Sequence, residues 1–138
     1  MAGTFAFVGS PDDVRPMSFT IRARSAALPA FLRERQVSIE GEVDVEGFAD
    51  HRYLRGILGL DLLRSRELPY EFAFTANDGE GYRFEGKTSL ASGAFIESMT
   101  VLSGVVCTAN RKEIGRALLR FDLRSDLVRF VTSFKTVR

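Results

Sequence analysis

The sequence is poor in the residues that form disulfides and metal sites. Its 138 residues include one cysteine, Cys107, and one histidine, His51. A single cysteine cannot form an intramolecular disulfide, and neither residue has partners at the spacing of a zinc site. We therefore expect no metal, no bound cofactor, and a reducing, cytoplasmic location.

Long hydrophobic runs and an excess of one charge are also absent. No apolar run approaches the roughly 20 residues of a transmembrane helix, and the first 16 residues lack the basic start and continuous apolar stretch of a secretory signal. Nineteen basic and eighteen acidic residues leave a formal net charge of +1, so no overall field attracts nucleic acid or an anionic membrane. We expect neither nucleic-acid binding nor a transmembrane segment.

The clearest structural signal is a β-hairpin over residues 69–90. The side chains that share one face by period-two alternation are aromatic in both arms: Tyr70, Phe72 and Phe74 in the first, Tyr82 and Phe84 in the second. Between the arms, residues 77–81 read Asn-Asp-Gly-Glu-Gly, which tolerates the positive φ angles of a hairpin loop. These glycines predict a turn, because a phosphate-binding loop would need a following Lys-Ser/Thr and a helix.

The rest of the chain is also rich in strand patterns. Alternation predicts strands over 17–24, 36–46, 53–63 and 114–123, with a helical alternative for the last, and an edge strand or loose arm within 1–16. The apolar stretch 94–109 is too long for one ordinary strand, so we expect a bend, bulge or turn near Ser103 and Gly104. Helical spacing predicts short helices over 28–35 and 125–134, and residues 47–51 are expected to be a connector.

Together these elements predict the fold class. Seven or eight strands at short spacings with two short helices favour a mostly β, antiparallel barrel or sandwich, a lipocalin-like barrel included. The length suits one domain with its own core. We expect residues 1–138 to form a single β-domain.

No residue pattern indicates a catalytic centre. His51 lies next to Asp50, where a surface role is the ordinary outcome and a general base or metal ligand is the alternative. Cys107 lies in an apolar run and reads as a small buried hydrophobe, because there is no second histidine to activate it as a nucleophile. The carboxylates Glu40, Glu42 and Asp44 follow the polar face of one strand and are expected to face water.

The candidate site is instead a ligand-binding interior. An eight-stranded barrel is just wide enough for one small apolar ligand, although the same aromatic residues would serve equally as ordinary core. Glu97 lies on an otherwise apolar face between Phe95 and Met99, where an acid must be paired, coordinated or protonated, and pairing with a rim arginine is the simplest outcome. The candidate wall consists of Tyr70, Phe72, Phe74, Tyr82, Phe84, Phe95, Glu97 and Met99.

A resemblance to a known family covers residues 17–137. The matching stretches are FTIRARSAALPAFL, VSIEGEVDVEGF, GILGLDLL, LPYEFAFTANDGEGYRFEGKTSL and RALLRFDLRSDLVRFVTSFKTV. In this order they resemble an accessory β-domain that accompanies bacterial glucose–methanol–choline oxidoreductases, including cholesterol-oxidase-like proteins. The resemblance implies a non-catalytic module beside a flavin enzyme that acts on sterol-like or lipid-like substrates. The chain itself lacks the Gly-x-Gly-x-x-Gly sequence that binds a dinucleotide.

Three functions follow as hypotheses. The leading one is a non-catalytic binding module for a hydrophobic small molecule or lipid, accessory to an oxidoreductase. The second is a protein-protein interaction or self-association module that uses an exposed edge or apolar patch. The third is a small isomerase or cyclase that uses Glu97 or His51.

Overall fold

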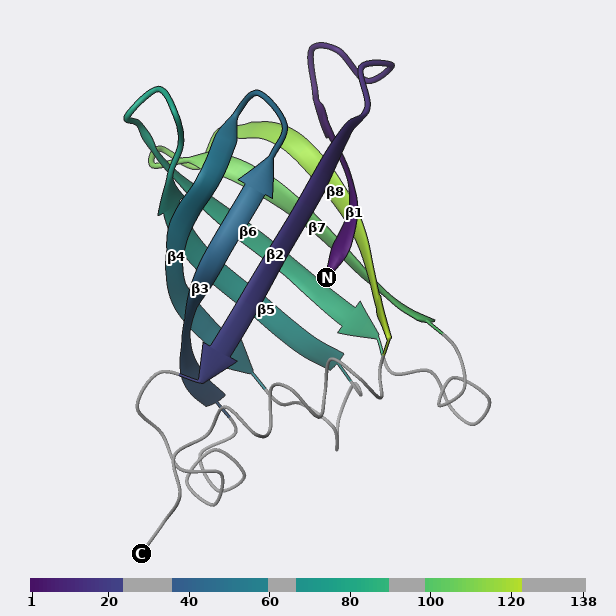
Figure 1. Ribbon diagram of the computed structural model, residues 1–138, viewed down its shortest axis with the longest axis vertical. Helices are drawn as coiled ribbons and strands as arrows, with labels where there is room; N and C mark the ends of the chain where they lie inside the picture. The colour runs from purple at the N-terminus through teal and green to yellow at the C-terminus, as the bar shows by residue number, and fades with distance from the viewer. Residues whose placement is uncertain (24–35, 60–66, 90–98, 123–138) are drawn as a thin grey trace, which may run out of the picture.

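The chain forms a closed, eight-stranded antiparallel β-barrel (Figure 1). The computed structural model describes residues 1–23, 36–59, 67–89 and 99–122. The strands in this part of the chain are β1 (Ala2–Phe7), β2 (Arg15–Ala23), β3 (Gln36–Val45), β4 (Ala49–Gly59), β5 (Glu67–Thr75), β6 (Gly81–Ser89), β7 (Met99–Thr108) and β8 (Glu113–Asp122). Each strand pairs with the next one, and β8 pairs with β1. The predicted antiparallel barrel is confirmed, and the sandwich alternative is excluded.

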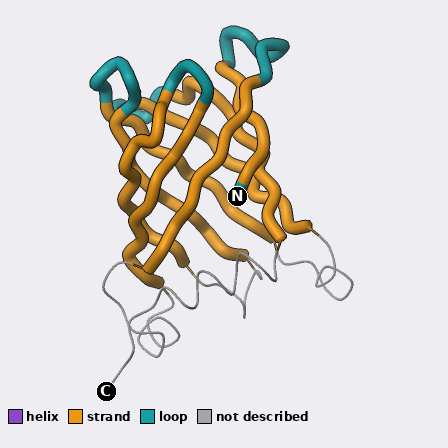
Figure 2. Tube along the Cα trace, in the orientation of Figure 1, coloured by secondary structure: helices purple, strands orange, loops and turns teal. Residues whose placement is uncertain are grey.

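The barrel has two different ends. Residues 8–14, 46–48, 76–80 and 109–112 connect consecutive strands at one end, which we call the turn end (Figure 2). Strands β2, β4, β6 and β8 run away from these turns and finish at the opposite end, which we call the far end (Figure 1). Every inner side chain can therefore be assigned a level between the two ends from its place in its strand.

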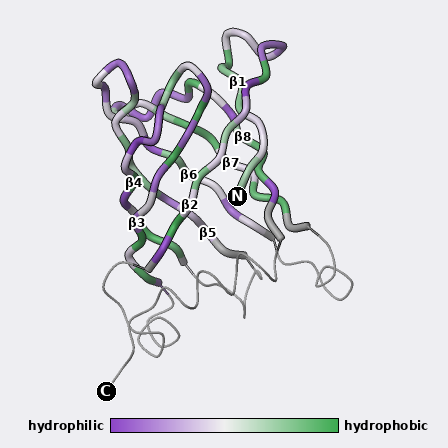
Figure 3. The backbone as a smooth tube through the Cα atoms, viewed as in Figure 1, coloured by the Kyte–Doolittle hydropathy of each residue, from purple (hydrophilic) through white to green (hydrophobic). Residues whose placement is uncertain are grey.

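Alternation of side chains between interior and solvent determines the core. In β3, the predicted inner residues Val37, Ile39, Gly41, Val43 and Val45 are all buried, and the intervening residues are exposed or half-buried. Along the strands, hydrophobic and hydrophilic residues accordingly follow one another (Figure 3). The hairpin over 69–90 is confirmed in the same way, as β5 and β6 pair with Phe72 opposite Phe84.

The N-terminal segment is a full member of the barrel. Ala2–Phe7 pairs with β2 on one side and with β8 on the other, so the expectation of a loose arm or edge strand within 1–16 is wrong. Phe5 is buried and belongs to the core. The sequence signal was weak because this strand has only six residues and its neighbour β8 lies at the other end of the sequence.

Strand β7 continues without interruption where a break was expected. The ladder runs through Ser103 and Gly104, and the register shifts only between Val106 and Cys107. Gly104 is needed for space, because a Cβ there would lie 2.5 Å from Cζ of Phe84. The split near Ser103 is therefore wrong for the described part, and residues 94–98 lie outside it.

Strand β4 begins earlier than predicted. Only residues 46–48 form the turn, so Asp50 and His51 belong to the strand and not to a connector. The register between β3 and β4 shifts between Val43 and Val45, and His51 has a φ of 45°. This bulge disturbs the alternation on which the sequence-based boundary depended.

The segment predicted as strand or helix and the two predicted helices have different outcomes. The segment 114–123 is a strand over its described length, so its helical alternative is wrong. The predicted helices 28–35 and 125–134 lie outside the described residues. The described part of the chain contains strands and turns but no helix.

Candidate functional site

The aromatic rings of the hairpin point into the barrel and contact one another. Phe72 and Phe84 lie opposite each other in the β5–β6 ladder, and their rings stack with centroids 4.8 Å apart. Phe19 reaches them from β2, with ring centroids 5.2 Å from Phe72 and 5.8 Å from Phe84. Since β2 is not a ladder neighbour of β5 or β6, these contacts cross the interior and fill the middle of the barrel.

A second aromatic cluster fills the turn end. Phe48, in the turn between β3 and β4, is buried and lies 4.9 Å from Tyr82, 5.3 Å from Phe7 and 6.0 Å from Phe5, centroid to centroid. The Phe48 carbonyl also accepts a hydrogen bond from the Asn77 N–H at 2.9 Å. The turn end is thus closed by packed rings.

The far end has a different lining. Its described inner side chains are mostly aliphatic, with Val37 opposite Leu58 in the β3–β4 ladder and Leu102 on β7. The aromatic exception is Tyr70, which is buried and lies opposite Leu58 in the β4–β5 ladder. All of these side chains are buried, and no charged side chain is buried among the described residues. Thr88 differs from these apolar side chains, because it is the one residue of a polar type that is buried in the described part.

Sequence reasoning missed part of this interior and named residues that the structure does not describe. Phe5, Phe19, Phe48 and Thr88 were not among the candidates, although Thr88 continues the inward period of Phe84. Phe95 and Glu97 lie outside the described residues. Met99 begins β7 opposite Asp122, but its side chain is also outside the described set. The role of these three candidates stays a prediction.

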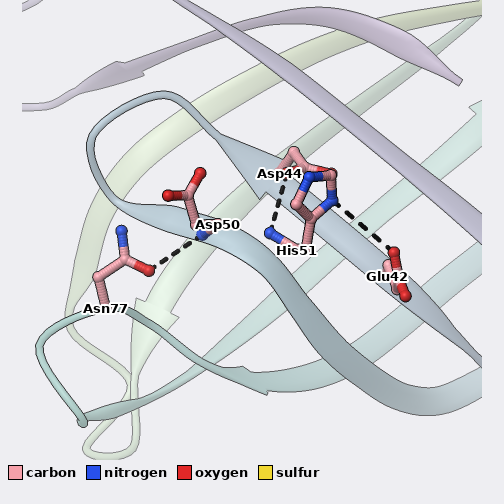
Figure 4. Close-up of polar contacts among 5 residues, drawn as sticks. All are labelled: Glu42, Asp44, Asp50, His51 and Asn77. Carbon is pink, nitrogen blue, oxygen red and sulfur yellow. Dashed lines mark hydrogen bonds and ion pairs between the residues drawn. The ribbon is translucent and has the colours of Figure 1, made fainter.

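His51 lies on the outer surface at the turn end (Figure 4). Its side chain is 77% exposed, with Nδ1 3.2 Å from Oδ2 of Asp44 and 3.8 Å from Oε2 of Glu42. The His51 backbone N–H donates to Oδ1 of Asp44 at 2.9 Å, which ties the bulged start of β4 to β3. This is a surface contact that stabilises the bulge.

Asn77, in the turn between β5 and β6, is hydrogen-bonded to the first residues of β4. Oδ1 of Asn77 accepts hydrogen bonds from the Asp50 N–H at 3.0 Å and from Nε of Arg52 at 3.1 Å (Figure 4). No group of three or more His, Cys, Asp or Glu side chains within the described ranges is placed to bind a metal ion. Among these residues, neither His51 nor its neighbours form an acid-base pair directed into the interior.

Two other ionisable sites show shifted pKa values. At the hairpin tip, the hydrogen bond from the Glu80 N–H, followed by that from the Tyr82 hydroxyl, lowers the pKa of Asp78. The same Asp78 carboxylate raises the pKa of Tyr82. Partial burial, with Glu85 and Glu113 nearby, raises the pKa of Cys107, which disfavours the thiolate that a nucleophile requires.

The fold places this chain in the class of closed, eight-stranded, antiparallel β-barrels. Comparison with protein-family models, with curated proteins and with solved structures finds no match to the chain. Within the described residues, no helix has the length and apolar character needed to cross a membrane.

Proposed function

We propose that this barrel is a non-catalytic binding module that takes up a hydrophobic small molecule or a lipid chain in the far-end half of its interior. The observation that carries the proposal is the unequal lining of the two halves. Packed aromatic rings occupy the middle and the turn end, whereas the described inner side chains at the far end are aliphatic apart from Tyr70 and Thr88. An interior of eight strands is wide enough for one such ligand.

The charge distribution supports an uncharged ligand. No charged side chain is buried in the part of the chain whose burial is described. Burying an ion against such a lining would cost several kcal/mol or more, because nothing there would compensate its lost hydration. The part of the ligand that enters the barrel is therefore apolar or neutral.

The test is uptake of a neutral, apolar fluorescent probe by the full chain. We expect N-phenyl-1-naphthylamine to bind with enhanced fluorescence and expect native mass spectrometry of gently purified protein to show a co-purified apolar molecule. Leu102→Trp, which adds bulk inside the barrel, is expected to abolish probe binding. Leu118→Trp, which adds the same bulk on the exposed outer face of β8, is the matched control and should bind normally.

Two results would count against the proposal. Failure of the wild-type chain to bind the probe or carry any apolar molecule would remove it. Equal binding by the Leu102→Trp and Leu118→Trp variants would show that the probe does not enter the barrel. If Leu102→Trp does not fold, Leu58→Phe offers a smaller addition on the same inner face.

The family resemblance extends this proposal to a partner. It suggests that the ligand is sterol-like or lipid-like and that the module acts beside a separate flavin oxidoreductase. Co-expression with such an enzyme and measurement of its turnover on a sterol substrate, with and without the barrel, would test this extension. Unchanged turnover and no association would contradict it.

A second candidate function, association with a protein, is favoured by the outer face of β7 and β8. Val101 and Leu118 are 41% and 44% exposed, and Leu118 lies opposite Ser103, two residues along β7 from Val101. Such neighbouring exposed aliphatic side chains are typical of interaction surfaces. Analytical ultracentrifugation would detect an oligomer that Leu118→Glu dissociates, and a strictly monomeric wild-type chain would argue against self-association.

The isomerase or cyclase hypothesis gains no support from the described residues. His51 lies on the outer surface, where its contacts are to carboxylates of the neighbouring strand. Glu97 lies outside the described part of the chain. Neither observation brings an acid or base into the interior.

A further inference from the structure

Thr88 combines complete burial with an unused hydroxyl group. It is the penultimate residue of β6, close to the far end, and its exposed fraction is 0%. Its Oγ1 has no hydrogen-bond partner among the described residues. Such an unpaired buried hydroxyl is rare in folded proteins and calls for a partner.

Among the described residues, the ladder neighbours of Thr88 offer its side chain no hydrogen-bond partner. Backbone pairing on both sides of β6 places Thr88 opposite Leu68 in β5 and opposite Leu102 in β7, so the local backbone groups serve the sheet ladders. The inner face of Leu102 offers only hydrocarbon. Thr88 therefore presents a donor and an acceptor at a position that is paired with a leucine in both ladders.

The choice of threonine is costly at this position. Valine has nearly the same shape and is at least as well suited to a strand, and it would bring no hydroxyl into the interior. Leaving a buried hydroxyl unpaired costs about 1–3 kcal/mol. The hydroxyl thus weakens the empty barrel and strengthens any complex in which it is paired.

We propose that Thr88 is the polar anchor of the interior ligand, and that this ligand is an apolar molecule with one uncharged hydroxyl or carbonyl group. This inference rests on the proposed function and specifies the chemical class of the ligand. A carboxylate or ammonium group is disfavoured, since no opposite charge is buried among the described residues to compensate it. The apolar body would lie against aliphatic neighbours such as Leu102, with its polar group directed to Oγ1 of Thr88.

The test compares two probes that differ in one hydroxyl group, 2-naphthol and naphthalene. Both are titrated into the wild-type chain and into Thr88→Val and Thr88→Ser, with binding followed by probe fluorescence. In Thr88→Val, which retains the shape without the hydroxyl, we expect 2-naphthol to bind about three- to tenfold more weakly and naphthalene to bind unchanged. Thr88→Ser retains the hydroxyl and is expected to keep the preference for 2-naphthol.

The outcomes separate this inference from the proposed function. If both probes bind the wild-type chain but respond equally to Thr88→Val, the barrel binds apolar molecules and Thr88 is not the anchor. If neither probe binds the wild-type chain, both proposals fail. The empty Thr88→Val variant should have a melting temperature no lower than that of the wild type. A large drop would mean that the hydroxyl has a structural partner, which would also overturn the inference.

Discussion

Adding a single methyl group at Gly104 is expected to disrupt the middle of the barrel. In Gly104→Ala the new Cβ would lie 2.5 Å from Cζ and 2.8 Å from Cε2 of Phe84. The Phe84 ring cannot withdraw easily, because Phe72 stacks on it at 4.8 Å and Phe19 lies at 5.8 Å. The methyl group must therefore displace a packed ring or distort the β6–β7 ladder.

The magnitude follows from the cost of overpacking. Extra methyl or methylene groups in a packed core typically cost about 1–3 kcal/mol, and we expect the upper part of this range because the contact is below 3.0 Å. Phe84→Leu alone should cost roughly 1–3 kcal/mol through lost burial. In the double variant the smaller leucine leaves room for the methyl group, so the combined loss should fall short of the sum by about 1 kcal/mol or more.

The assay is urea unfolding followed by circular dichroism for the wild type, both single variants and the double variant. Gly81→Ala is the matched control, because a Cβ there meets nothing within 4 Å, and its effect should stay within about 0.5 kcal/mol. Simple additivity of Gly104→Ala and Phe84→Leu would refute the reasoning. It would mean that the space at Gly104 is required by the backbone, such as the Glu85 oxygen of β6 at 2.9 Å, and not by the Phe84 ring.

Three further predictions concern other sites. Gly56→Ala should be the more damaging glycine change and prevent stable folding in a thermal melt, because its Cβ would lie 1.9 Å from the backbone oxygen of Glu71, and backbone cannot move aside as a ring can. Asp78 has a lowered pKa, so its stabilising contribution is present above the ordinary value of 3.8 and is lost as the pH falls through the lowered pKa. Asp78→Asn should therefore reduce the loss of unfolding free energy at acid pH, measured by urea unfolding at a series of pH values. An unchanged loss at acid pH would contradict this prediction. Cys107 should react more slowly with iodoacetamide in the folded than in the urea-unfolded chain, since its pKa is raised; equal rates would disprove this.

The sequence predicted well those features that depend on local alternation. Strand β3 and the β5–β6 hairpin were assigned correctly, because one face of each meets the core and the other meets water. The alternation also correctly placed Phe72 and Phe84 on the inner face, where the structure pairs them directly. Period-two alternation is a property of the strand itself and needs no knowledge of its neighbours.

Features that depend on distant partners could not be predicted. The pairing of β1 with β8, and the contacts of Phe19 across the interior, join segments that only the closed barrel brings together. Phe48 lies in a turn, where sequence rules expect exposure, yet it closes the turn end. The role proposed for Thr88 depends on the lack of a hydrogen-bond partner for its hydroxyl among the described residues, and a sequence does not display this.

The order of strands around the barrel has a kinetic consequence. Seven of the eight ladders join neighbours in sequence, and such hairpins can form locally with a small loop-closure entropy. The eighth ladder, between β1 and β8, brings Gly3 opposite Leu119. Closing so long a loop before the other ladders form would cost about 3 kcal/mol more in chain entropy than closing a hairpin turn. We infer that docking of β1 is a late step in folding. Until β1 docks, β2 and β8 each present an unpaired edge, which makes the unclosed barrel the species most prone to aggregation.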